Sequence, residues 1–213
     1  MVYPTRRPGR AQVVADGAFP SSTTGTSGTD TTSVDTSAVY TTTAASGQDL
    51  VLTSAAIENG ELLSAFKCEM KSMADGTEDS IPLAWSGVPT GTGSLAIIMH
   101  HFPNPNDTDP DRANQYLLLW DIPPSVSEIA HGAADDGTWF MGANKDNAKI
   151  SYTSPCSQDA TSGGKSYTIT IYALSSTPAS LPTASSLDVT FGVLVNAIGS
   201  VTILDTASIT FTD

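Results

Sequence analysis

Three histidines are the first side chains to test for chemistry, because imidazole serves both acid–base catalysis and metal binding. His100 and His101 are adjacent in an apolar run that predicts a strand, so their rings point to opposite faces and cannot bind one metal ion together. His131 is the only other histidine in the chain. We therefore predict no metal site and no cofactor.

Aspartate and serine are the other groups that could hold an ion or act on a substrate. Asp107, Asp109 and Asp111 lie close together in DTDPDRAN, residues 107–114, and could bind calcium through their oxygens. The segment lacks the glycine and the terminal glutamate of an EF-hand loop, so we interpret it as a solvated acidic turn. Ser86 has no recognisable base beside it, and no Gly-x-Ser-x-Gly turn occurs. We predict that the protein is not an enzyme.

Composition and charge exclude several classes of function. Only 15% of the residues are charged, while Thr, Ser, Ala and Gly are abundant, which favours short strands and polar turns over a helical bundle. The net charge is −13, and all of it lies in residues 49–213. Such an acidic body repels nucleic-acid phosphates and anionic membrane surfaces. No run approaches the roughly 18 apolar residues that span a bilayer, and the start lacks the apolar core of a secretory signal.

The first 48 residues form an arm that differs from the rest of the chain. Residues 20–48 are rich in Ser, Thr and Gly and have almost no apolar content, so on their own they cannot offset the entropy of ordering. Residues 1–48 could be held by the body of the same chain, by a neighbouring copy or by another protein, and we predict one of the last two. VYTTTA, residues 39–44, is the segment that we expect to add a strand to a neighbouring sheet edge.

From residue 49 the pattern predicts a β-rich domain, residues 49–213. DLVLTSAAI and SYTITIYAL alternate, whereas SLAIIMHHF and QYLLLWDIP are nearly continuous apolar runs, which is typical of strands buried on both faces. SIPLAWSGVP, residues 80–89, contains Pro82 and Pro89, which do not suit a central strand. We predict an edge or crossover segment there, with Trp85 either in the core or in the wall of a pocket.

Six segments, in order, resemble the phosphatidylethanolamine-binding protein family, in the bacterial and archaeal branch related to Raf kinase inhibitor proteins. They are LVLTSAAIENGELLSAFKCE, EDSIPLAWSGVPTGTGSLAIIM, QYLLLWDIPPSVSEIAHGA, GANKDNAKISYTSPCS, GGKSYTITIYAL and the last strand, spanning about residues 50–211. The resemblance implies an antiparallel β-sandwich. A large central sheet would pack on a smaller one, with a short C-terminal helix near residues 188–198. It also implies a small anion pocket, with SIPLAWSGVP as one wall and Trp85 supporting it.

The residues of the implied pocket differ from the family pattern. The family's Asp-Pro-Asp-Ala-Pro loop aligns with HFPNP, residues 101–105, so both acids are lost. A family histidine corresponds to Tyr116, and the Pro-His-Arg-Tyr stretch corresponds to GKSY, residues 164–167. The ligand donors that remain are His101, Tyr116, Lys165 and Tyr167. A solvated Lys165 at the end of a glycine-rich loop is the competing interpretation.

Cys68 and Cys156 are the only cysteines, and residue patterns alone allow either one bridge or two buried thiols. Both fall where the bacterial branch of the family often has cysteine. If the two segments flank the pocket, the resemblance implies that a disulfide could join them.

Three hypotheses of function follow. The first is a non-enzymatic structural protein, anchored by residues 1–48 in a virion, an extracellular filament or a surface layer; it accordingly favours a surface or virion location. The second is a binding protein for a small anion or a phospholipid headgroup. The third is a kinase or protease inhibitor, which rests on the resemblance alone. The sequence favours the first, because the pocket residues have changed.

Overall fold

The structure is a computed structural model that describes residues 49–67, 78–156 and 164–213. The predicted arm, residues 1–48, lies outside these ranges. Its contacts with other proteins, and the assembly function that depends on them, therefore stay predictions.

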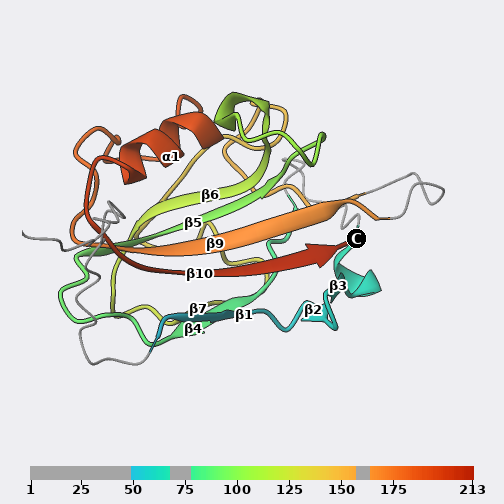
Figure 1. Cartoon of the computed structure of the whole chain (residues 1–213), viewed down its shortest axis with the longest axis horizontal. Helices are drawn as coiled ribbons and strands as arrows, with labels where there is room; N and C mark the ends of the chain where they lie inside the picture. The colour runs from blue at the N-terminus through green and yellow to red at the C-terminus, as the bar shows by residue number, and fades with distance from the viewer. Residues whose placement is uncertain (1–48, 68–77, 157–163) are drawn as a thin grey trace, which may run out of the picture. The chain divides into compact units, whose positions relative to one another are not determined.

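Two sheets and one helix form three layers (Figure 1). The small sheet has the order β1-β4-β7, and the large sheet has the order β2-β3-β10-β9-β5-β6-β8. The small-sheet strands are β1 (Val51–Thr53), β4 (Leu83–Ser86) and β7 (Glu128–Ile129). The large-sheet strands are β2 (Ile57–Glu58), β3 (Glu61–Leu62), β5 (Ser94–His101), β6 (Asn114–Ile122), β8 (Phe140–Met141), β9 (Ser166–Leu174) and β10 (Ile203–Thr212). The helix α1 (Phe191–Ile198) covers the other face of the large sheet, and two short 3₁₀ turns are η1 (Ser64–Phe66) and η2 (Pro110–Arg112). This confirms the predicted sandwich with a C-terminal helix.

The central strands are apolar throughout because both faces are covered. In β5, Leu95, Ile97 and Met99 face the core between the sheets, whereas Ala96 and Ile98 face the core beneath α1. The period-2 alternation of a strand sends successive side chains into these two cores. The same alternation delivers His100 and His101 to opposite faces at the end of β5.

The pairing pattern is antiparallel with one exception. β10 pairs with β9 over nearly its whole length in an antiparallel register, but β3 pairs with β10 in parallel at Thr212 and Glu61. The large sheet is therefore mixed, and its parallel contact lies at one end of β10.

SIPLAWSGVP was expected to be an edge or crossover segment, and that prediction is wrong. β4 is the middle strand of the small sheet, between β1 and β7. Pro82 precedes the strand and Pro89 follows it, so neither proline removes a donor from within the ladder. Trp85 lies within β4, is 5% exposed and packs in the core between the sheets.

Helix α1 is fixed at its start by a buried side chain from β6. The side-chain oxygen of Gln115 accepts a hydrogen bond from the main-chain N–H of Phe191 at 2.8 Å. The Gln115 amide donates to the carbonyl oxygen of Asn144 at 3.2 Å and to the Asn147 side chain at 2.8 Å. One glutamine thus joins β6, the loop after β8 and α1. In the part of the chain that the structure describes, no helix is long and apolar enough to cross a membrane.

Candidate functional site

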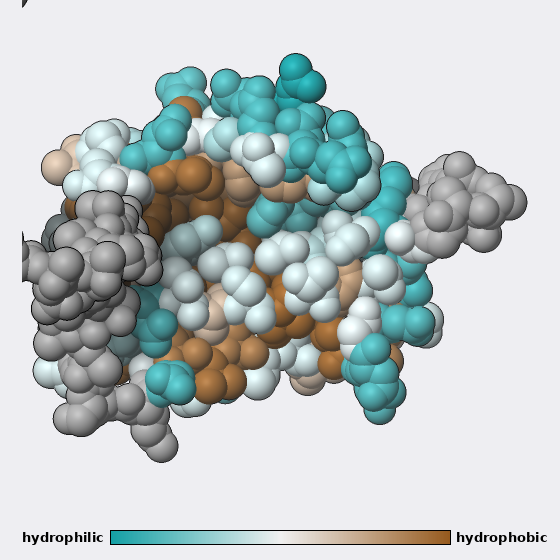
Figure 2. Space-filling view, viewed as in Figure 1, coloured by the Kyte–Doolittle hydropathy of each residue, from teal (hydrophilic) through white to brown (hydrophobic). Residues whose placement is uncertain are grey.

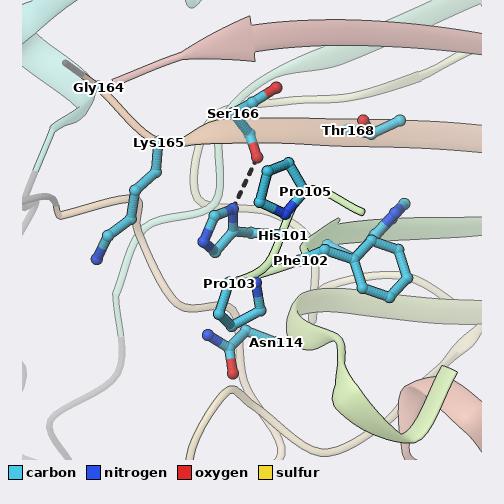
Figure 3. Close-up of a pocket in the computed structure, with 10 residues that line it drawn as sticks. His101, Phe102, Pro103, Pro105, Asn114, Gly164, Lys165, Ser166 and Thr168 are labelled. Atoms are coloured by element: carbon cyan, nitrogen blue, oxygen red, sulfur yellow. Dashed lines mark hydrogen bonds between the residues drawn. The ribbon is translucent and has the colours of Figure 1, made fainter. Parts of the chain in front are cut away.

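A cavity of about 640 Å³ lies at the end of the large sheet (Figure 3). Its walls come from the end of β5, the loop that follows, the first residue of β6, and the start of β9 with the residues before it. The lining residues are His100, His101, Phe102, Pro103, Pro105, Asn114, Gly164, Lys165, Ser166 and Thr168. The antiparallel order β9-β5-β6 brings these segments together, because the end of β5 lies beside the starts of both neighbours.

His101 is held at the centre of this group. It is buried, and its Nδ1 donates a hydrogen bond to the main-chain carbonyl oxygen of Ser166 at 2.8 Å. A carbonyl oxygen only accepts, so Nδ1 carries a proton. The ring also packs against Tyr167, with centroids 5.3 Å apart. The orientation of His101 is therefore set by the main chain of Ser166 and by the ring of Tyr167.

His100 lies on the other face of β5 and still reaches the cavity. Its ring packs 5.2 Å from Phe102 and 4.9 Å from Phe191. Burial, with a smaller contribution from the neighbouring His101, lowers the pKa of His100 from 6.5 to about 4. The ring is therefore neutral at pH 7, and its buried Nδ1 has no hydrogen-bond partner among the described residues.

Lys165 and the last residue of the chain shape one rim of the cavity. The main-chain N–H of Lys165 donates to the Asp213 carboxylate at 3.0 Å, and the Asp213 N–H donates back to the Lys165 carbonyl at 3.3 Å. Gly164 lies so close that an added Cβ would collide with the main-chain oxygen of Asp213. The cavity has Lys165 on one side and Phe102, with Thr168 near it, on the other (Figure 3).

The predicted site residues fall into two groups. His101 and Lys165 line the cavity, whereas Trp85, Tyr116 and Tyr167 belong to the core between the sheets and are not among its lining residues. The rings of Tyr116 and Tyr167 meet edge to face with centroids 5.0 Å apart. Burial raises the pKa of both phenols, and the Asp213 carboxylate adds to the effect. Both tyrosines are neutral; Tyr167 packs against His101, and Tyr116 packs against Tyr167.

Several lining residues were not predicted to line a pocket. His100, Phe102 and Asn114 were read as strand or loop positions, yet all three reach the cavity. Their position in the sequence could have identified them, because each lies within two residues of the end of β5 or the start of β6. Side chains from both faces of a sheet can meet beyond the point where its strands end.

The acidic loop is a surface turn, as predicted. Asp107 and Asp109 pair with Arg112 at 3.3 and 3.4 Å, and the Asp109 side chain caps η2 by accepting from Asp111 N–H. Within the described ranges, no three His, Cys, Asp or Glu side chains gather as metal ligands would.

Cys156 is not a free thiol. Cys68 lies outside the described residues, so the predicted pairing of these two cysteines stays a prediction. Intact-mass measurement with and without reductant would test it.

Comparison with known proteins places the chain in a family. The family model described as phosphatidylethanolamine-binding protein matches residues 53–212. A UPF0098 protein of Methanothermobacter thermautotrophicus is 29% identical over 136 residues, which cover 62% of this chain and 80% of that protein. A solved phosphatidylethanolamine-binding protein homologue of Chlamydia trachomatis has a TM-score of 0.60 at 26% identity and matches 78% of this chain and 97% of its own. E. coli YbcL, at 23% identity, has the same fold with a TM-score of 0.60 over 77% of this chain and 97% of its own. Because the family model covers most of the chain, this protein belongs to the phosphatidylethanolamine-binding protein family.

Proposed function

We propose that the protein is a non-enzymatic binding protein that holds a small organic anion in the cavity at the end of the large sheet. The observation that carries the proposal is the cavity itself, with its volume of about 640 Å³ and its two unlike sides. Ligand pockets usually have volumes of about 300–1,000 Å³ and combine apolar walls with a few polar groups. A ligand with an anionic head and an apolar body fits that division.

The polar side supplies the groups that would bind the anionic head. Lys165 brings a positive charge, and Asn114 and Ser166 bring an amide and a hydroxyl. Opposite unit charges 4 Å apart attract by about 1 kcal/mol in water and about 4 kcal/mol near a protein surface. Acidic groups farther away are screened over about 10 Å at ordinary ionic strength, whereas the Asp213 carboxylate beside Lys165 accepts hydrogen bonds from the Lys165 N–H and the Tyr167 hydroxyl.

The apolar side would bind the body of the ligand. Phe102, Pro103 and Pro105 contribute rings without charge, and the neutral ring of His100 continues this surface. Burial of apolar surface contributes about 25 cal/mol for each Å² removed from water. This side favours an aromatic or branched group over a bare inorganic ion.

The state of the histidines supports binding without catalysis. Among the described residues, Nε2 of His101 has no serine hydroxyl as a hydrogen-bond partner that it could activate. His100, with its pKa near 4, is a weak base whose ring faces phenylalanines. We therefore propose that the cavity retains its ligand unchanged.

The replaced loop acids bear on which phosphate compound fits best. His101 and Pro103 stand where the resemblance places the two family aspartates. Without those carboxylates, none of the described lining residues is anionic, and the Asp213 carboxylate at the rim already accepts from the Lys165 N–H and the Tyr167 hydroxyl. We propose that an organic phosphate with an aromatic body binds more tightly than a phospholipid headgroup.

Isothermal titration calorimetry tests this function with three probes. Phenyl phosphate is expected to bind saturably and more tightly than O-phosphoethanolamine or inorganic phosphate. Lys165→Met removes the charge and keeps the length, so it should weaken phenyl phosphate binding about tenfold, or about 1.4 kcal/mol. Lys149→Met is the matched control, because Lys149 is exposed and outside the cavity lining. Absence of saturable binding by all three probes would contradict the proposal, and tighter binding of O-phosphoethanolamine would contradict the preference.

A further inference from the structure

Among the described strands, only β3 pairs with the outer edge of β10, and it does so at one end. β10 has 10 residues and pairs with β9 on its inner side. On its outer side, β3 reaches it only at Thr212, whose N–H donates to the Gly60 carbonyl at 2.9 Å. A strand at the edge of a sheet presents unpaired main-chain groups that another chain can pair with.

The position of Thr212 identifies the outward-facing groups. Alternate residues of a strand point their main-chain N–H and C=O to the same side. Since the Thr212 N–H points away from β9, those of Thr206, Ser208 and Thr210 do so as well. The Thr206 N–H is satisfied by the Asp205 side chain at 2.8 Å. The N–H groups of Ser208 and Thr210 have no partner in the parts of the chain that the structure describes.

Little in the sequence of β10 protects this edge. Natural edge strands are commonly blunted by lysine, proline or inward-pointing charge. ILDTASITFT contains no lysine, arginine or proline, and its single charge, Asp205, lies near one end. Figure 2 shows pale and brown surface, with little teal, where β10 crosses the molecule.

The side chains on the two faces of β10 differ, so they favour a partner strand in which apolar and hydroxyl residues alternate. On the α1 side, Ser208 and Thr210 form a row of hydroxyls with Thr170 and Thr168, at 2.9 and 3.3 Å. On the other side, Ala207 and Ile209 pack against the core between the sheets. A strand added beside β10 would place hydroxyl side chains next to the first row and apolar side chains next to the second.

Carboxylates stand at both ends of the open edge. At one end, Asp205 accepts a hydrogen bond from the Leu50 N–H at 2.9 Å. Asp49 directly precedes Leu50 in the chain. At the other end, Glu61 of β3 lies opposite Thr212 in the β3–β10 pairing and opposite Glu58 in the β2–β3 pairing. A second copy in antiparallel register would bring its Asp205 end against the Glu61 end, so like charges would meet at both ends.

From these features we propose that the β10 edge binds an extended segment of another polypeptide by strand addition. The segment carries lysine or arginine at both ends and alternating apolar and hydroxyl residues between them. Main-chain hydrogen bonds to Ser208 and Thr210 supply affinity, while the alternating flanks and the terminal charges supply register.

The test uses the full chain and the peptide Ac-Lys-Val-Thr-Val-Thr-Val-Lys-NH2, with amide hydrogen exchange followed by NMR. At saturation, exchange at Ser208 and Thr210 is expected to slow by at least about tenfold. Ala207 and Ile209 pair with β9 and serve as internal controls whose exchange does not change. A peptide with glutamate in place of both lysines should bind at least about tenfold more weakly, and an N-methylated peptide should not bind.

Two substitutions locate the contact. Ser208→Pro removes one outward N–H and none of the bonds to β9, so it should weaken peptide binding about tenfold. Ser208→Ala keeps the N–H and should bind like the wild type. The proposal is overturned if Ser208 and Thr210 already exchange as slowly as Ala207 in the free protein, which would mean that a second copy or another segment occupies the edge. Equal binding of the glutamate peptide also overturns it.

Discussion

At the scale of single residues, the cavity depends on two adjacent histidines in unlike surroundings. His101 is oriented by a main-chain carbonyl, and His100 is enclosed by aromatic rings. Their neighbours are small or rigid, and Gly164 lets the start of β9 approach the end of β10. Each of these features predicts a measurable effect of substitution.

Gly164→Ala should destabilise the rim of the cavity. The new Cβ would collide with the main-chain oxygen of Asp213, so the two segments must move apart. We expect the free energy of unfolding in urea to fall by about 1–2 kcal/mol. Gly199→Ala is the control, because its Cβ would meet nothing closer than 3.6 Å and its φ of −64° suits alanine. A Gly164→Ala protein as stable as the control would contradict the account of this rim.

His100 should make stability depend on pH between about 4 and 6.5. The unfolded chain binds a proton at His100 near pH 6.5, whereas the folded chain does so only near pH 4. The unfolded state therefore holds more protons in this window, and the free energy of unfolding falls as the pH drops through it. His100→Phe removes the titration, so urea unfolding should show a smaller loss from pH 6.5 to 4 than in the wild type. His131→Gln, at an exposed histidine, is the control, and a loss unchanged by His100→Phe would refute the assignment.

The sequence identified part of this site. His101 and Lys165 were predicted because histidine and lysine are recognisable donors, and both line the cavity. Phe102 and Pro105 were missed as lining residues because apolar types in a loop carry no chemical signal. They line the cavity only because the end of β5 lies beside the starts of β6 and β9 in the folded sheet.

At the scale of elements, the cavity and α1 are coupled through β6. Asn114, the first residue of β6, lines the cavity, and the next residue, Gln115, holds the start of α1. The neighbouring hollow of about 330 Å³ includes Gln115, Thr190 and Gly192. The first two residues of β6 therefore contribute to the cavity and to the attachment of α1.

Gln115→Ala should loosen α1. The substitution leaves the buried Phe191 N–H without its partner, whereas the Asn144 carbonyl keeps its hydrogen bond from the Asn147 N–H. A buried group left unsatisfied costs about 1–3 kcal/mol, so we expect a loss of at least about 1 kcal/mol in urea unfolding. Asn106→Ala, at an exposed loop position, should change stability by less than about 0.5 kcal/mol. A change in the Gln115 variant no larger than in this control would show that the contact is not structural.

The elements themselves were largely predictable. The long runs at β5, β6, β9 and β10 were recognised because burial on two faces, or alternation, leaves a clear pattern. β4 was misplaced because its flanking prolines were taken as part of the strand. The short strands β2, β3, β7 and β8 have two residues each, too few to show a period.

At the scale of the whole molecule, the described body is an acidic sandwich with two specialised regions. One is the cavity at the end of the large sheet, and the other is the open edge of β10. The net charge of −13 opposes anions at long range, so anion binding must come from Lys165 and from groups within the cavity. The location of the bound anion therefore tests the proposed function directly.

The most direct measurement is the map of amide chemical shifts in ¹⁵N-labelled protein titrated with phenyl phosphate. The account predicts saturable shifts concentrated at His101, Phe102, Asn114, Gly164 and Lys165, and weaker shifts with Lys165→Met. Shifts concentrated at the hollow beside Thr190 and Gly192, or no saturable shifts at all, would contradict the claim that the cavity at the end of the large sheet is the binding site.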